Sequence, residues 1–165
     1  NYGDSLNPAN PVSEPYNWTT EENFARVVPG TESFDFRNVE SGNNFACAET
    51  KNNTIVCWGQ NKSGQLGRNN IDSSIYYTVY SFAPQEISLM DNSVNVGVKA
   101  GSLVVQDSTA CAIGAADNQV YCWGASFYSN MYEDSASYKM VPTKLTGFTQ
   151  SYNFKKIKLA ESGMC

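Results

Sequence analysis

The chain has 165 residues, of which 41% are hydrophobic and 13% aromatic, so it can form one ordinary domain with a core and is not a disordered tail. With 11 basic against 16 acidic residues and a net charge of −5, it lacks the excess of Lys and Arg with which proteins bind nucleic acid. It contains no apolar run of about eighteen residues, so the sequence predicts no membrane span.

Two segments of the chain resemble each other. Asn43–Gly59 reads NNFACAETKNNTIVCWG, and Ser108–Gly124 reads STACAIGAADNQVYCWG. Each consists of Cys-Ala, a polar loop and a strand-like segment that ends in Cys-Trp-Gly. This internal similarity predicts two copies of one structural unit.

Each unit has the pattern of a β-hairpin. In the first, Phe45–Ala48 and Thr54–Trp58 are short runs suited to strands, and two asparagines between them favour a turn. In the second, Ala110–Ile113 and Gln119–Trp123 flank a similar loop. No long segment shows the 3.6-residue apolar period of a helix, so we expect an all-β fold.

A proline-led piece precedes each hairpin, at Pro29, Pro84 and Pro142. The third such piece ends at Cys165, where the first cysteine of a third hairpin is expected. We therefore expect residues 1–24 to be the tail of a preceding repeat, 25–83 the first full repeat, 84–141 the second, and 142–165 the start of a third. On this view the chain begins inside one repeat and stops inside another.

The densest basic cluster lies near the end of the chain, at residues 154–159. Its three lysines alternate with apolar residues, a pattern typical of one strand with a solvated face rather than of a nucleic-acid patch.

The first unit resembles the repeat of the regulator-of-chromosome-condensation superfamily, more narrowly its secreted, cysteine-bearing forms. The resemblance rests on Ser41-Gly42, Cys47-Ala48, Val56-Cys57-Trp58-Gly59, Asn61 and Gly64-Gln65-Leu66-Gly67, and it extends over roughly residues 25–165. It implies four-stranded antiparallel blades, usually seven to a ring, so we expect a partial β-propeller. The second repeat departs from the pattern because it lacks the Gly-Gln-Leu-Gly string.

The cysteines have the spacing of cross-strand pairs. Opposed Cα atoms in an antiparallel hairpin lie within the range that a disulfide spans, so we expect Cys47 to pair with Cys57 and Cys111 with Cys122. Free core thiols or a metal site are the alternatives, but zinc would favour CxxC or CxxH spacing and the chain has no His. We expect the partner of Cys165 to lie outside the chain. Disulfides would indicate an oxidising compartment, hence an extracellular or cell-surface protein.

In each repeat a tryptophan and a glycine directly follow the second cysteine. Trp58 and Trp123 are interpreted as packing between blades rather than as ligand platforms. Gly59 and Gly124 are interpreted as strand ends with a close backbone approach.

Three sequons, at Asn17, Asn52 and Asn61, are candidate glycan acceptors, and Asn52 and Asn61 fall in expected exposed turns or loops. Candidate partner contacts come from two aromatic insertions that a generic blade lacks. They are Tyr76, Tyr77, Tyr80, Phe127, Tyr128 and Tyr132.

The sequence offers little support for catalysis, because it has no His to act as a base and its carboxylate pairs lie in expected loops. We expect no enzyme activity, no catalytic or metal-binding residues and no cofactor. The leading hypothesis is an extracellular module for protein binding or structural assembly, with other proteins or further copies of itself as partners, for example in a surface filament. A secreted inhibitor of a hydrolase is the alternative. A guanine-nucleotide exchange factor fits less well, because disulfides do not suit a reducing compartment.

Overall fold

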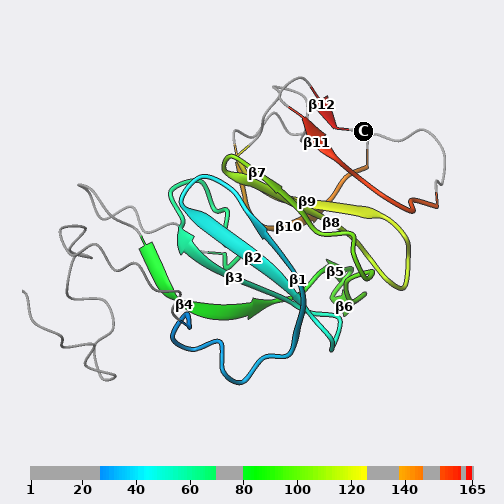
Figure 1. The fold of residues 1–165 in the computed structure, drawn as a ribbon. Coiled ribbons are helices and arrows are strands. Elements are labelled where there is room, and N and C mark those ends of the chain that lie inside the picture. The colour runs from blue at the N-terminus through cyan, green and yellow to red at the C-terminus, as the bar shows by residue number, and fades with distance from the viewer. Residues whose placement is uncertain (1–26, 70–79, 126–137, 147–152, 161–162, 165) are drawn as a thin grey trace, which may run out of the picture.

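The computed structural model describes residues 27–69, 80–125, 138–146, 153–160 and 163–164, drawn in colour in Figure 1. These residues form strands, turns and loops, with no helix among them. No helix able to cross a membrane was found in this part of the chain.

Two four-stranded antiparallel sheets dominate the fold. The first has the order β1-β2-β3-β4 and consists of β1 (Phe36–Ser41), β2 (Phe45–Thr50), β3 (Ile55–Gln60) and β4 (Tyr80–Ile87). The second has the order β10-β9-β8-β7 and consists of β7 (Val104–Gln106), β8 (Thr109–Ile113), β9 (Val120–Ala125) and β10 (Tyr138–Lys144). Two small two-stranded sheets accompany them: β5 (Met90–Asp91) with β6 (Val94–Asn95), and β11 (Leu159–Ala160) with β12 (Gly163–Met164).

The two repeated segments are the central hairpins of the two large sheets. β2 pairs with β3 and β8 pairs with β9, as the strand-like runs and the turn residues between them predict. Each connection includes an asparagine with positive φ, Asn53 at 61° and Asn118 at 56°. Asparagine adopts this left-handed conformation more readily than most residues, which explains why both loops carry it.

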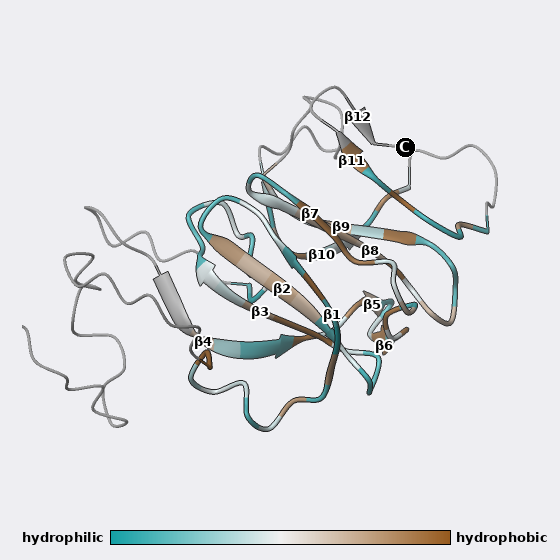
Figure 2. Cartoon of the chain, viewed as in Figure 1, coloured by the Kyte–Doolittle hydropathy of each residue, from teal (hydrophilic) through white to brown (hydrophobic). Residues whose placement is uncertain are grey.

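Figure 2 shows hydrophobic residues, in brown, along central strands such as β2, and the buried ones form two cores. Ala110 and Ala112 of β8 point into a cluster shared with the first sheet, whereas Cys111 and Ile113 point into a second cluster beyond it. The second sheet is therefore covered on both faces, which is what stacked blades require.

The first strands of three sheets lie side by side, and the edges that they form are called the inner edges below. β1 contacts β7, and β7 contacts β11, each being the first strand of its sheet (Figure 1). The opposite edges are β4 and β10. The two four-stranded antiparallel sheets, joined along the inner edges, confirm the expected all-β fold of a partial propeller.

The expected repeat boundaries do not coincide with the sheets. The boundary at 83/84 falls inside β4, and the one at 141/142 falls inside β10. The sequence places both boundaries at prolines, Pro84 and Pro142. The prolines instead lie in edge strands beside irregularities in register, where a missing N–H is tolerated.

The expected strand over residues 154–159 is mostly absent, since β11 begins only at Leu159. The burial alternates as predicted, with Ile157 buried between exposed Lys156 and Lys158. The segment is held by other means: Lys99 Nζ donates to the Phe154 carbonyl at 2.9 Å. In this segment, therefore, the alternation of polar and apolar residues predicts which side chains are buried but does not predict strand pairing.

Candidate functional site

The cysteines lie directly opposite each other in the central hairpins. Cys47 pairs with Cys57 and Cys111 with Cys122, each at a Cα–Cα distance of 4.1 Å and with disulfide-bonded sulfurs. All four side chains are fully buried. Each bridge therefore ties the middle strands of one blade together inside a core.

The contact between the first and second large sheets, hereafter the seam, is fastened by a buried carboxylate. Glu49, at the end of β2, is 0% exposed. Its oxygens accept hydrogen bonds from the backbone N–H groups of Gly101 at 2.8 Å, Ser102 at 2.9 Å and Leu103 at 2.7 Å. A buried charge is tolerated when it is paired and hydrogen-bonded, and here its bonds hold the chain that leads into β7.

Arg37 of β1 completes this group. Its Nε donates to Glu49 Oε2 at 3.1 Å, Nη1 donates to Asn53 Oδ1 at 2.9 Å, and Nη2 donates to the Val98 carbonyl at 3.3 Å. One guanidinium thus joins β1, the β2–β3 turn and the second repeat. The sequence patterns did not single out Arg37 or Glu49; a lone charged residue in the otherwise apolar β2 was the available signal.

A second fastening of the seam involves Trp123, which is fully buried. Its Nε1–H donates to the Gln65 carbonyl at 3.0 Å, and Gln65 belongs to the Gly-Gln-Leu-Gly string of the first repeat. Trp123 packs in the core cluster to which both large sheets contribute. Trp58 differs, because it is partly exposed and its ring lies 6.4 Å from that of Phe36 in its own sheet.

The glycines that follow the two tryptophans have the expected close approaches. Gly59 has φ of 105° and Gly124 has φ of 88°, values that side-chain-bearing residues rarely adopt. A Cβ at Gly59 would collide with the Asn44 carbonyl oxygen, and one at Gly124 would collide with that of Ser108. Both strands nevertheless continue for one residue beyond the glycine.

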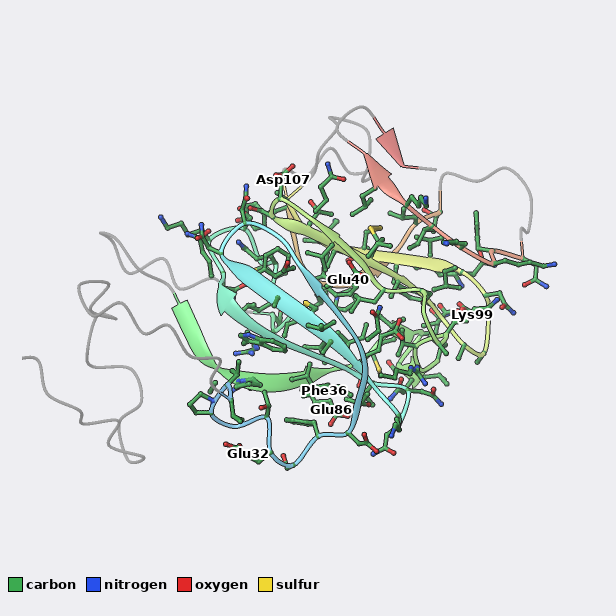
Figure 3. The ribbon with its side chains drawn as sticks, viewed as in Figure 1. Glu32, Phe36, Glu40, Glu86, Lys99 and Asp107 are labelled. Carbon is green, nitrogen blue, oxygen red and sulfur yellow. A yellow bond between two sulfur atoms is a disulfide. The ribbon has the colours of Figure 1, made fainter. Side chains whose placement is uncertain are left out.

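A third tie joins two turns at the same side of the seam. The N–H of Asn43, between β1 and β2, donates to the Asp107 carbonyl at 2.7 Å, and the Asn43 side chain reaches the Asp107 carboxylate at 3.2 Å. Asp107 lies in the turn between β7 and β8 (Figure 3). Corresponding turns of successive blades are therefore fixed relative to each other.

The two described sequons differ in exposure. Asn52 is exposed in the β2–β3 turn. The expectation of an exposed acceptor is wrong for Asn61, which is only 3% exposed and whose Oδ1 accepts from the Leu66 N–H at 2.9 Å. The side chain closes the loop that follows β3, a role for which asparagine is suited, and little of it is accessible in the folded chain.

Several candidate residues lie outside the described part of the chain. They are Asn17, Tyr76, Tyr77, Phe127, Tyr128, Tyr132 and Cys165. Tyr80 is the first residue of β4, where its backbone pairs with Gln60.

A cluster of charged side chains lies where the end of β10 meets β5. Lys144 Nζ is 2.8 Å from Asp91 Oδ2 and 3.2 Å from Asp117 Oδ2, and the Tyr121 hydroxyl donates to Asp117 at 2.7 Å. Burial alone would raise the pKa of Asp117, but hydrogen bonds from Gln119, Tyr121 and Lys144 hold it below its usual value. The Asp91 hydrogen bond raises the pKa of Lys144, with burial opposing and Asp117 adding to the shift. These ties are structural in character, since every charge has a partner.

Within the described residues, no three His, Cys, Asp or Glu side chains gather closely enough to hold a metal ion. The hollow of interest is instead an opening of about 490 Å³ at the inner edges of the sheets, lined among others by Arg37, Glu40, Lys156 and Lys158. It is called the inner hollow below.

Known proteins share both the repeat and the fold. Residues 36–65, from β1 to Gln65, match the family model of the regulator of chromosome condensation (RCC1) repeat. No curated protein matches the sequence significantly. Human WBSCR16 has a similar structure, with a TM-score of 0.56 and 17% identity over 69% of this chain and 26% of its own.

Two structures of the yeast RCC1 protein Prp20 are also similar, both at 23% identity over 74% of this chain. The complex with Kap60 has a TM-score of 0.56 and is covered over 27% of its chain, and Prp20p from Saccharomyces cerevisiae has a TM-score of 0.54 and is covered over 28%. The chain thus spans about a quarter of the length of these proteins. Residues 36–65 thus match a recognised RCC1 repeat, and the two four-stranded sheets are arranged as blades of the β-propeller fold that these structures share.

Proposed function

We propose that the chain is a protein-binding or assembly module of an extracellular β-propeller, and that it acts by contact rather than by catalysis. The observation that carries this proposal is the seam. Bonds from Glu49, Trp123 and Asn43 fix the strands and turns of adjacent blades against each other. A rigid platform loses little conformational entropy on binding, which favours recognition of another protein.

The similar structures support this proposal in a general way. One is the structure of Prp20 bound to Kap60, and the other was solved together with a study of the binding of Prp20p to Gsp1p and histones. Each is a finding about that protein, and the common element is the use of this fold for contacts with proteins.

The extracellular setting is proposed from the two disulfides. Such bridges persist in oxidising compartments and are rare in reducing ones. Thiol labelling of protein isolated from its source without reductant tests this directly. We expect Cys47, Cys57, Cys111 and Cys122 to resist labelling before reduction and to react after it. Labelling of all four without reduction would refute the setting.

Binding is tested with the complete, oxidised protein immobilised and exposed to the extracellular fraction of its source. A captured partner is then purified and titrated against the protein. We expect saturable binding that is lost when the protein is reduced and unfolded. If no protein binds saturably, the proposed binding function is contradicted. The size of the protein in native solution distinguishes binding of another protein from self-assembly. A single monomeric species would exclude self-assembly and leave binding of another protein.

A further inference from the structure

The inner hollow lies where three successive repeats meet. β1 contributes Arg37 and Glu40, the start of the second sheet contributes Gly101 and Leu103, and residues 156–158 contribute the third wall. Its volume of about 490 Å³ is within the range of sites that bind ligands. It lies at the inner edges, where β1 contacts β7 and β7 contacts β11.

One wall of the hollow is held rigidly. Arg37 has hydrogen bonds from all three of its guanidinium nitrogens, and its charge is paired with Glu49, which is itself fully buried. Arg37 is therefore committed to the seam. It shapes the hollow but has little positive charge to offer a ligand.

The wall formed by residues 156–158 carries two lysines whose charges are unpaired within the described residues. Lys156 and Lys158 are exposed and flank Ile157, which is 3% exposed and packs into the second core. Because the residue between them points into the core, both lysines project away from it, and both line the hollow. Neither has an ion pair or hydrogen bond within the described residues, whereas Lys99 and Lys144 are both bonded.

We propose that the inner hollow binds an acidic peptide segment of a partner protein, with carboxylates of that segment pairing with Lys156 and Lys158. The proposal rests on the protein-binding function above and assigns its site and the chemistry of its partner. Glu40, on the opposite wall, is available to accept N–H groups of the bound peptide backbone.

A nucleic acid fits this hollow less well than a peptide. Nucleic-acid binding depends on many phosphate contacts, but the hollow offers two free cations and includes a carboxylate from Glu40. The chain as a whole has a net charge of −5, which repels a long polyanion. A short acidic segment needs only the local charge of the two lysines.

The test uses the complete, oxidised protein and a fluorescent peptide of alternating aspartate and glycine, with an otherwise identical asparagine peptide as the neutral probe. We expect saturable binding of the acidic peptide, weakened by salt, and no binding of the neutral one. Lys156→Gln and Lys158→Gln should each weaken binding on the order of fivefold, the upper end for an exposed pair. Lys155→Gln is the matched control, because it removes the same charge from an exposed neighbour that does not line the hollow.

Three results would overturn the proposal: equal binding of the two peptides, an equal effect of Lys155→Gln, or tighter binding of a single-stranded oligonucleotide than of the acidic peptide. Melting temperatures of the variants verify the fold, and the salt titration of the unaltered protein gives an answer independent of them. If a captured partner binds normally to the Lys156→Gln and Lys158→Gln proteins, this site is wrong while the binding function stands. If no partner binds at all, the function itself fails.

Discussion

The carboxylate of Glu49 accepts a hydrogen bond from the backbone N–H of Ser102 at 2.9 Å, and this bond joins one blade to the next. In the second repeat, the residue two positions after the first cysteine is Ile113 rather than a glutamate. Ile113 lies in the apolar core beyond the second sheet. The second residue after the first cysteine therefore stabilises one contact between blades through its charge and the next through hydrophobic packing.

Replacing Glu49 should destabilise the seam more than replacing any exposed carboxylate. Glu49→Gln keeps the shape but removes the charge that pairs with Arg37 and that receives three N–H groups. We expect a loss of about 1–3 kcal/mol in the free energy of unfolding, measured by urea titration. Glu86→Gln, on the exposed side of β4, is the control and should change it by less than about 0.5 kcal/mol. Equal effects of the two would show that the Glu49 bonds contribute no net stability.

The two tryptophans should respond differently to the same substitution. Trp123→Phe removes the donor to the buried Gln65 carbonyl and leaves a gap in the core, so we expect a loss of about 2–4 kcal/mol. Trp58→Phe keeps an aromatic ring beside Phe36 on a partly exposed face and should cost less than about 1.5 kcal/mol. Urea unfolding followed by circular dichroism measures both. A larger loss for Trp58→Phe would contradict the assignment of Trp123 to the seam.

The sequence predicts features that depend on residues close together in the chain, and it does not predict those that depend on residues far apart. The Cys-Ala to Cys-Trp-Gly hairpins are local, so the strand pairs and the opposition of Cys47 and Cys57 follow from the strand-like runs, the turn residues between them and the cysteine spacing. Pro84 begins an expected repeat yet lies inside β4, because the effect of a proline depends on whether its strand lies at an edge, which is a property of the assembled sheet. The partner of Glu49 lies 53 residues away at Ser102, and no local pattern reports such a contact.

A sequon in the sequence does not reveal whether its asparagine is exposed in the fold, as Asn61 shows. Comparing glycosylation at Asn52 and Asn61 tests whether exposure decides which sequon carries a glycan. In a eukaryotic secretory host, Asn52 should carry an N-linked glycan because it is exposed in a turn, whereas Asn61 is 3% exposed and hydrogen-bonded to Leu66. Intact mass of the folded, secreted protein should fall by one glycan in Asn52→Gln. It should show no loss of a glycan in Ser63→Ala, which removes the second sequon without altering the Asn61 side chain. Loss of a glycan mass from the Ser63→Ala protein would show that Asn61 accepts a sugar and that its loop differs from the described one.

The cluster of Asp117, Tyr121 and Lys144 predicts how stability depends on pH. Because the pKa of Asp117 is lower in the folded state than its ordinary value of 3.8, its ionised form stabilises the fold above that pH, and the contribution disappears as the pH falls through the folded pKa. The pKa of Lys144 is raised, so its contribution is present below its ordinary value of 10.5 and is lost only as the pH rises through the folded pKa.

Between these limits, therefore, Asp117→Asn should be less stable than the unaltered protein, by on the order of 1–2 kcal/mol for the loss of a charge-assisted hydrogen bond. As the pH falls through the folded pKa and the unaltered carboxyl becomes protonated, the difference should shrink towards zero. Urea midpoints of both proteins, measured at pH 7 and over a series of lower pH values, provide the measurement. A difference that persists unchanged at the lower pH would mean that Asp117 stabilises the sheet through its shape and neutral hydrogen bonds rather than through the charge it shares with Lys144.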